Sequence, residues 1–500
     1  MMKKIIASIS AILVCATSLN VRAQQVLTLD ECKQMAIENN NALKTAQQKI
    51  EIANYDKKIA FANYFPKVSA TGTYMYSSED IKLISDESAD KLQNMGTGVQ
   101  NNITDVMTSL MSDPAVISKY LTDPAFQKMV NTLKGADIAT PINAIGAQIA
   151  EAMTLDMQNT TAAIVSVQQP IFMGGKIVAS NAMAEYAKQL AESQYDQEYS
   201  QVIVDIEQAY WQIVSIAAKK QLSENYAALL KQMSADVDAL IAEGYATPSD
   251  ALTIKVKANE ADMLYTKATN GLALAKMLLC KEIGLPLDSE IVLADENSEV
   301  IPTPELTEVL TDEQVYAARP EIRSLDLAKK IYDQKVTIAR SDALPKVALS
   351  ANYVITNPNV LNGFQNNFGG FFTAGVMVSV PICHGGENIH KTNKAKAEAA
   401  LTQYKLDDAK EKISLQVAQL RQQENEAFEK LTMAQSNLAN AEENLRVANA
   451  GWSEGMVASS VLLQAQTAWL QAHSECIETG VELQMCSVKL AKAEGRIVNE

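Results

Sequence analysis

The residues best suited to metal or acid–base chemistry in this chain are Cys383, His384 and His390. Thiolates and imidazoles are common zinc ligands, but a spacing of six residues does not put two imidazoles on one face of a helix, and no third ligand is near. The sequence also has no nucleophile elbow, phosphate loop or HExxH motif. We therefore predict that the protein is not an enzyme and that it holds neither a metal nor a cofactor.

The remaining cysteines and the charge balance exclude further classes of protein. An odd number of cysteines without C-x-x-C spacing argues against a disulfide framework, so we expect them in the core or at helix contacts. After residue 23 these cysteines are Cys32, Cys280, Cys383, Cys476 and Cys486. The chain has 59 acidic and 43 basic residues, which makes nucleic acid an unsuitable partner.

One passage of the sequence occurs twice. The run Pro170-Ile171-Phe172-Met173-Gly174-Gly175 returns 211 residues later as Pro381-Ile382-Cys383-His384-Gly385-Gly386. The same offset maps Glu243-Gly244 onto Glu454-Gly455. We interpret the chain as a tandem duplication, with repeats over residues 24–284 and 319–500 and an irregular linker over 285–318.

Two segments of nearly equal length follow the repeated passages and contain no glycine or proline. They predict long helices over residues 176–243 and 387–450, each about 100 Å long at 1.5 Å per residue. Apolar residues recur at alternating spacings of four and three in the first of them, the period of a coiled coil. Shorter helices are predicted over 29–64, 248–284, 319–343 and 458–496.

Period-2 alternation of apolar and polar residues replaces the helical pattern in four places. It predicts strands over residues 67–76, 163–170, 346–354 and 372–380. Strands of about ten residues have the length that crosses a membrane in a tilted barrel. Four strands cannot close a barrel, and an open edge in lipid leaves backbone groups unpaired. We therefore expect the chain to oligomerise.

The segment between the first two strands, residues 77–161, is much longer than its counterpart in the second repeat. Its dispersed methionines and helical composition favour an ordered surface insertion with a small helical core. A lid or a phage-receptor loop is the alternative.

The N-terminal segment predicts a secretory signal peptide over 1–23. Met1 to Ala23 has two lysines, an apolar run and a small-residue cleavage site.

Together, the export signal, the duplication, the paired strands and the long helices resemble the TolC-type outer-membrane efflux proteins. The resemblance rests on the two Pro-to-Gly-Gly passages and on the segments 243–252 and 451–455, and it covers the mature chain. It implies a mixed α and β fold with long coiled-coil-like hairpins. It also implies a homotrimer in which four transmembrane strands from each copy close a 12-stranded barrel.

The resemblance further implies roles for particular residues. At the strand-to-helix junctions, the glycines allow a sharp turn and the prolines end the strand. These junction residues are Pro170, Gly174, Gly175, Pro381, Gly385 and Gly386. In the family, the hairpin tips contact a periplasmic adaptor, which carries onto Gly244, Tyr245, Thr247, Gly455 and Met456. We also predict positive φ at Gly244 and Gly455.

The family closes its periplasmic end with a tyrosine and an arginine that reach an aspartate, and with inner aspartate rings. Here Asp250 matches the acceptor, while Trp452 and Val457 stand at the tyrosine and arginine positions, so the indole N–H of Trp452 is the remaining candidate donor. The inner positions are Val461 and Gln464, which favour a neutral constriction closed by packing or dewetting.

The resemblance thus predicts an outer-membrane duct with a long periplasmic extension. It would serve a tripartite efflux or type I secretion system with a periplasmic adaptor and an inner-membrane pump of the RND, ABC or MFS type. Drugs, dyes, bile salts or similar small molecules would pass through passively. The alternative is an exported coiled-coil spacer or a periplasmic adaptor without a pore.

Overall fold

The computed structural model describes residues 25–298, 301–304 and 308–498, so the predicted signal peptide over 1–23 lies outside the described residues. The chain forms two compact units. The strand unit comprises Ala62–Gly174 and Ala343–Ile382, and the helical unit comprises the rest. Each unit therefore takes segments from both of the predicted repeats.

Two helices of 67 residues dominate the helical unit, α9 (Lys176–Ala242) and α13 (Glu387–Ser453). Each follows a glycine with φ 85° and ψ −2°, which are Gly175 and Gly386. The second helix was predicted to end at residue 450, but it continues to Ser453, because the left-handed residue that terminates it is Gly455 and not Gly451.

Shorter helices line up along α9. The N-terminal helix α3 (Asn41–Ala62) lies along its first part, where Lys57 Nζ is 2.6 Å from Glu185 Oε2. The helix α10 (Pro248–Ile283) lies along its last part, where Lys231 Nζ is 2.7 Å from Asp262 Oδ1.

The single helix predicted over 29–64 is wrong, because the segment forms two helices. Helix α2 (Leu29–Asn39) ends and α3 begins around Asn40. The Asn40 side chain accepts a hydrogen bond from the N–H of Ala42 at 2.8 Å and donates one to the carbonyl of Glu282 at 3.2 Å. A contact across 242 residues of chain thus fixes the break.

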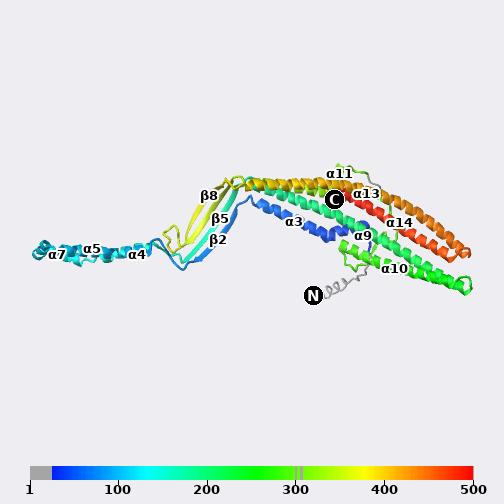
Figure 1. Ribbon diagram of the computed structural model, residues 1–500, viewed down its shortest axis with the longest axis horizontal. Coiled ribbons are helices and arrows are strands. Elements are labelled where there is room, and N and C mark those ends of the chain that lie inside the picture. Colours follow the sequence, from blue (N-terminus) through cyan, green and yellow to red (C-terminus); the bar gives the residue numbers. More distant parts are fainter. Residues whose placement is uncertain (1–24, 299–300, 305–307, 499–500) are drawn as a thin grey trace, which may run out of the picture. The chain divides into compact units, whose positions relative to one another are not determined.

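The second half of the chain covers α9 on its other sides and lines α13. Helices α12 (Pro320–Ser341) and α14 (Ser459–Ala493) each contact both long helices. The Ser193 hydroxyl donates to the carbonyl of Pro320 at 2.8 Å, and Lys219 Nζ lies 2.5 Å from Glu478 Oε1. Figure 1 shows these helices running side by side within the helical unit.

The linker predicted as irregular over 285–318 contains regular structure. Strand β6 (Ile291–Leu293) pairs in parallel with β1 (Gln25–Leu27), and α11 (Asp312–Ala318) begins with a capping box on Thr311. The side chains of Leu27 and Leu293 are buried against α2, α9 and α10. Burial of these short apolar strands fixes the linker to the main hydrophobic core.

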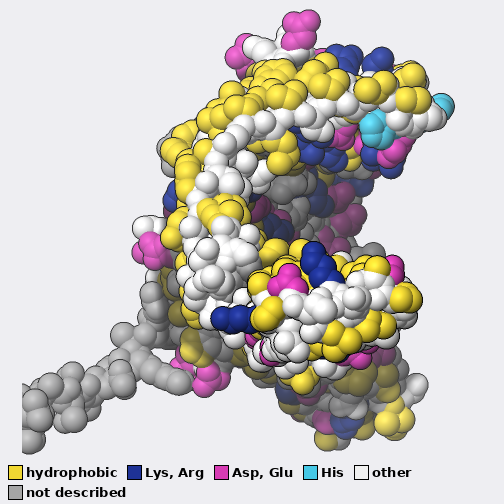
Figure 2. Space-filling view, turned by 90° about the vertical axis from the view of Figure 1, so that its left-hand side faces the viewer, with side chains coloured by type: hydrophobic (Ala, Val, Ile, Leu, Met, Phe, Trp, Pro, Cys, Tyr) yellow, Lys and Arg dark blue, Asp and Glu magenta, His cyan; other side chains and the backbone are white. Residues whose placement is uncertain are grey.

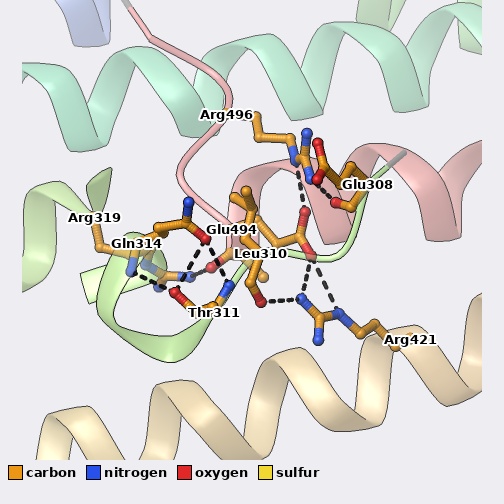
Figure 3. A network of polar contacts seen from close by, with 9 residues as sticks. Glu308, Leu310, Thr311, Gln314, Arg319, Arg421, Glu494 and Arg496 are labelled. Atoms are coloured by element: carbon orange, nitrogen blue, oxygen red, sulfur yellow. Dashed lines mark hydrogen bonds and ion pairs between the residues drawn. The ribbon is translucent and has the colours of Figure 1, made fainter. Parts of the chain in front are cut away.

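A network of polar contacts fixes the rest of the linker to the second hairpin (Figure 3). The carboxylate of Glu494 is buried and accepts from Arg421 Nη2 at 2.8 Å and from Arg496 Nε at 2.6 Å. Arg421 also donates to the carbonyl of Leu310 at 3.0 Å, and Arg496 donates to that of Glu308. The two arginines thereby satisfy a buried carboxylate while holding the linker backbone.

The strand unit contains one antiparallel sheet, in the order β2–β5–β7–β8. The last strand of the first repeat pairs with the first strand of the second, and β2 and β8 form the edges. The bounds are β2 (Lys67–Tyr76), β5 (Asn159–Phe172), β7 (Lys346–Asn357) and β8 (Gly369–Ser379).

The segment predicted as a loop over 77–161 is largely helical. The hairpin of β3 (Ile81–Lys82) and β4 (Thr154–Leu155) leads into five helices, which we call the insertion helices. They are α4 (Asp86–Gln93), α5 (Met95–Leu110), α6 (Pro114–Thr122), α7 (Pro124–Gly135) and α8 (Ala139–Ala152). The segment thus has the helical structure that was expected, and its buried apolar side chains are those of Val130 and Ala150.

The five cysteines within the described residues are all free, and four of them lie within helices. Burial raises the pKa of the Cys32 thiol to about 12 and also raises that of Cys280. Cys383 was expected at a helix contact and is instead exposed, because it lies in the segment between β8 and α13. Among the described residues, no helix combines the length and the apolar character that crossing a bilayer requires.

Candidate functional site at the hairpin tips

Both hairpin tips end their long helix with the same backbone motif. At the first tip, Tyr245 N–H donates to the carbonyl of Leu240 at 2.8 Å, and Gly244 has φ 83°. At the second, Met456 N–H donates to the carbonyl of Gly451 at 2.8 Å, and Gly455 has φ 70°. These are Schellman motifs, in which the left-handed residue is a glycine. The prediction of positive φ at both glycines is confirmed.

The residues predicted to contact an adaptor are presented at the surface of the tips. The side chain of Tyr245 is 81% exposed and that of Met456 is 77% exposed. Thr247 is also exposed. Large apolar side chains with such exposure on a well-hydrogen-bonded turn are suited to contact another protein.

Asp250, the predicted acceptor of the gate, is occupied within its own chain. It forms a capping box with Thr247, whose N–H and hydroxyl lie 3.0 and 2.7 Å from Asp250 Oδ2. The hydroxyl of Ser459, which the sequence analysis missed, lies 3.4 Å from Oδ1. The hydrogen bonds from Thr247 hold the pKa of Asp250 below its usual value. The carboxylate is therefore charged near neutral pH and joins the two tips.

Trp452 lies in an apolar cluster that both hairpins share. It packs with Ile241, Ala246 and Leu445 against a group of buried side chains. That group consists of Met233, Val237, Ala251, Ile254, Ala448, Leu462 and Ala465. Trp452 was predicted as the remaining hydrogen-bond donor of the gate. Its place in this cluster gives it a packing role between the tips.

The remaining gate positions lie on two sides of the second tip. Val457 is half-buried, and a Cβ added to Gly451 would come within 2.4 Å of its Cγ2 atom, so glycine is needed there. Val461 and Gln464 are exposed on α14, and each is turned by about 100° from the buried residue that follows it, Leu462 or Ala465. Their side chains are thus free to face another copy of the chain or a lumen.

The strand-to-helix junctions carry left-handed glycines as expected. Gly174 and Gly385 have φ values of 63° and 58°. The prediction that Pro170 ends its strand is wrong, because β5 continues to Phe172. A register shift between Pro170 and Phe172 accommodates the proline, which cannot donate to a sheet ladder. Pro381 does follow the end of its strand, β8.

The chemistry available at these sites is hydrogen bonding and apolar packing. In the part of the chain that the structure describes, no three His, Cys, Asp or Glu side chains are placed to hold a metal ion. His390 instead approaches the first turn of its own helix, 3.6 Å from a Cβ built on Gly386. The tips are therefore suited to binding and to mechanical closure.

Comparison with known proteins finds a family match in the second half of the chain. The model of the outer membrane efflux protein family matches residues 313–496. The alkaline protease secretion protein AprF of Pseudomonas aeruginosa is 22% identical over 320 residues, which cover 62% of this chain and 64% of that protein. The match thus spans less than two thirds of the curated relative.

Solved structures share the fold over nearly the whole chain. A membrane protein from Pseudomonas aeruginosa has a TM-score of 0.70 at 15% identity, covering 93% of each chain. The CmeC outer membrane channel of Campylobacter jejuni has a TM-score of 0.69 at 15% identity, covering 94% of this chain and 86% of its own. The chain thus matches the outer membrane efflux protein model over residues 313–496 and shares its fold with these solved structures.

Proposed function

We propose that three copies of this chain form an outer-membrane channel, the exit duct of a tripartite efflux or type I secretion system. The four strands of each copy contribute to a 12-stranded barrel in the membrane. The long helices extend into the periplasm and surround a passive, water-filled tunnel. The two halves of the chain arise from a tandem duplication in this proposal, which accounts for the equal lengths of α9 and α13.

The observation that carries the proposal is one apolar face that runs across all four strands. The register places Val68 opposite Val167, Val167 opposite Ala351, and Ala351 opposite Ala374. Because side chains alternate along a strand, the whole row lies on one face. Rows parallel to it add Tyr74, Val165, Leu349, Tyr353, Phe372 and Val376. Figure 2 shows hydrophobic side chains gathered along the outer margin of the curved sheet.

The opposite face of the sheet carries more polar residues, such as Ser69, Ser166, Asn352 and Thr373 in one row, together with an apolar row of Ile164, Val354 and Phe371. Apolar side chains of the first face are strongly exposed, with Val68 at 68% and Phe372 at 67%. A sheet that is bare and apolar on one side and more polar on the other fits a barrel between lipid and a water-filled lumen. The edges β2 and β8 would then pair with neighbouring copies.

The tips form the proposed gate and the adaptor-binding surface. Asp250, Trp452, Val457, Val461 and Gln464 would meet their counterparts from other copies at the closed end. Here Asp250 links the tips through Thr247 and Ser459, which supports closure by packing and neutral contacts. The exposed Gly244, Tyr245, Thr247, Gly455 and Met456 would receive a periplasmic adaptor, and with it an inner-membrane pump of the RND, ABC or MFS type.

The gate is tested by single-channel recording of Asp250→Ala. Loosening of the closed state is expected to raise the open probability and the mean conductance. Asp250→Asn separates the loss of the negative charge from the loss of the hydrogen-bond acceptor, because the asparagine amide oxygen still accepts from Thr247. Ser249→Ala, a neighbouring exposed position, is the control. Unchanged conductance in Asp250→Ala would remove Asp250 from the gate.

The channel is tested by single-particle imaging of full-length protein extracted from isolated outer membranes. A threefold hollow particle with a helical tunnel of about 100 Å is expected. A particle without threefold symmetry or a lumen would favour the alternative, an exported coiled-coil spacer or an adaptor without a pore. The match to AprF supports protein secretion and the match to CmeC supports a channel, while drugs, dyes and bile salts stay candidate cargoes.

A further inference from the structure

The insertion helices have a specific internal packing. A Cβ added to Gly146 on α8 would lie 1.8 Å from the carbonyl oxygen of Leu92, and one added to Gly96 on α5 would lie 2.4 Å from that of Ala139. The side chain of Asn143 accepts from the N–H of Gly96 at 2.8 Å and donates to the hydroxyl of Thr97 at 2.7 Å. Close approach and a side-chain cap therefore hold α5 and α8 in one arrangement.

This packed arrangement leaves about half of its large apolar side chains exposed to water. Within residues 77–158, all of which the structure describes, the apolar side chains that are buried are those of Val130 and Ala150. The exposed large ones are Ile81, Leu83, Met95, Val99, Val106, Leu110, Ile117, Leu121, Met129, Leu133, Ile145, Ile149 and Met153. An apolar surface of this extent on an ordered helical element marks a surface that another molecule covers.

The exposed side chains on α5 form a stripe along one face. Met95, Val99, Val106 and Leu110 are spaced by four, seven and four residues, which keeps them within about 60° of the helix circumference. On the adjoining α8, Ile145 and Ile149 are one turn apart. The stripe has the spacing of a helix face that packs on another helix.

The same two helices are almost free of charge. Helix α5 has one charged side chain, Asp105, and α8 has one, Glu151. The acidic residues of the insertion lie mostly elsewhere, including Asp86, Glu87 and Asp90 on α4. Charged residues are depleted at the centre of protein interfaces, so like-charge repulsion does not oppose the contact of two identical α5–α8 surfaces.

The insertion is firmly tied to an edge of the sheet. It arises between the edge strand β2 and its neighbour β5, and the pairing continues beyond the sheet. Ser77 N–H donates to the carbonyl of Gln158 at 2.9 Å, Ile81 pairs with Leu155, and Leu83 N–H donates to the carbonyl of Met153 at 2.9 Å. Any contact that completes the β2 edge with another copy therefore also brings in that copy's insertion.

We propose that the insertions of the three copies pack against one another through the α5 and α8 stripes and form a helical cap at the outer opening of the duct. The proposal rests on the trimeric channel argued above. Pairing of the sheet edges raises the local concentration of the insertions to about the millimolar range, as for short tethers. The occupant of the stripe is a second copy of this chain. The tether to the sheet edge brings the insertion of that copy close, the sparse charge lets two identical surfaces meet, and the exposed apolar side chains gain burial from the contact.

Cysteine cross-linking in the full-length protein tests the cap. In a Cys383→Ser background, which removes the exposed native thiol, Val106→Cys is treated with a short bismaleimide in outer-membrane vesicles. Asn101→Cys is the matched control, because this exposed position on the same helix is turned by about 140° from Val106. We expect covalent dimers in Val106→Cys at a yield at least fivefold above that of the control.

The outcomes separate the cap from the channel. Native mass measurement on the same samples gives the oligomeric state. A trimer without preferential Val106 cross-linking overturns the cap and leaves the channel standing. A bimane probe attached at Val106→Cys that enters lipid vesicles also overturns the cap and assigns the stripe to a membrane surface. A monomer would overturn the channel itself. As a second readout, Val106→Lys is expected to increase single-channel conductance, and an unchanged conductance counts against a cap at the opening.

Discussion

Helices α9 and α13 have the same length and the same N-terminal glycine geometry, yet they differ strongly in burial. Helix α9 has 21 buried residues and α13 has 9. The reason is their neighbours, since α9 contacts α2, α10, α12 and α14, whereas α13 contacts α12 and α14. Turn chemistry therefore determines where the two helices begin and end, while tertiary contacts determine how much of each is covered.

The difference identifies the free flank of α13. Its exposed apolar side chains are Ile389, Leu401, Tyr404, Leu415, Phe428, Met433 and Val447. In the proposed trimer, this flank would meet a neighbouring copy. The two helices are thus expected to respond differently when their apolar side chains and polar contacts are altered, and alike when their N-terminal glycines are altered.

The largest expected difference comes from truncating one apolar side chain on each helix. Ile213 on α9 is fully buried and Leu415 on α13 is 59% exposed in the single chain. Ile213→Ala should lower the free energy of unfolding by about 2–5 kcal/mol through lost burial and a cavity. Leu415→Ala should cost less than about 1 kcal/mol in dissociated chains. Thermal unfolding in detergent measures both, and equal losses would contradict the comparison.

The polar contacts of the two helices should differ next. Arg421 joins α13 to the buried Glu494, while Tyr210 on α9 donates to Asp295 Oδ2 at 2.6 Å. Glu494→Gln removes a charge that two arginines share and should cost about 2 kcal/mol, whereas Tyr210→Phe removes one hydrogen bond and should cost about 1 kcal/mol. Unfolding by denaturant tests the order, and a larger loss in Tyr210→Phe would reverse it.

The caps should behave alike, which sharpens the contrast. Gly175 and Gly386 share φ 85° and have open space where a Cβ would lie, apart from an ordinary contact of His390 at Gly386. Alanine at either position should cost about 1–2 kcal/mol from left-handed backbone strain alone. The melting temperatures of the two variants test this prediction. Unequal decreases would mean that burial of a long helix changes how much the glycine at its N-terminus matters.

The smallest expected effect concerns the short helices at the tips. Helix α10 begins with the Thr247–Asp250 capping box, and α14 begins at Ala458 without a side-chain cap. The pKa of Asp250 is lower in the folded chain than in the unfolded chain. Its contribution to folded-state stability is therefore present above the unfolded pKa of about 3.9 and is lost as the pH falls through the folded pKa. The difference in melting temperature between wild type and Asp250→Asn should therefore vanish in acid.

Ala458→Ser provides the matched control for that experiment. Ala458 already has the extended backbone of an N-cap, with φ −69° and ψ 151°, so a serine hydroxyl can accept from the first turn of α14. The gain in melting temperature should not depend on pH, because serine does not titrate. A gain that falls in acid would point to a change elsewhere at the tips.

The sequence predicts the local features of this fold well. The absence of glycine and proline indicates the long helices, alternation indicates the strands, and the T-P-S-D run at Thr247 contains a readable capping box. The insertion helices α6 and α7 also have local signals, since Asp113 and Asp123 each precede a proline at the first helical position.

Contacts between distant segments could not be predicted. The break at Asn40 depends on Glu282, the pairing of β1 with β6 joins segments more than 260 residues apart, and Ser459 reaches Asp250 across 209 residues. Such contacts depend on how the helices pack, and single residues carry no local sign of them. The apolar neighbours of Trp452 could not be predicted for the same reason, because its cluster draws on all four helices of the two hairpins.

The apolar face of the sheet has a consequence for biogenesis. In the proposed channel, each newly exported copy carries two unpaired strand edges and a bare apolar surface through an aqueous compartment before it assembles, which is a strong aggregation hazard. Its helical unit has its own core and can fold first. The sheet must then be escorted by a holding chaperone or delivered quickly to the membrane, so the supply of such escorts should limit how much of this protein a cell can place in its envelope.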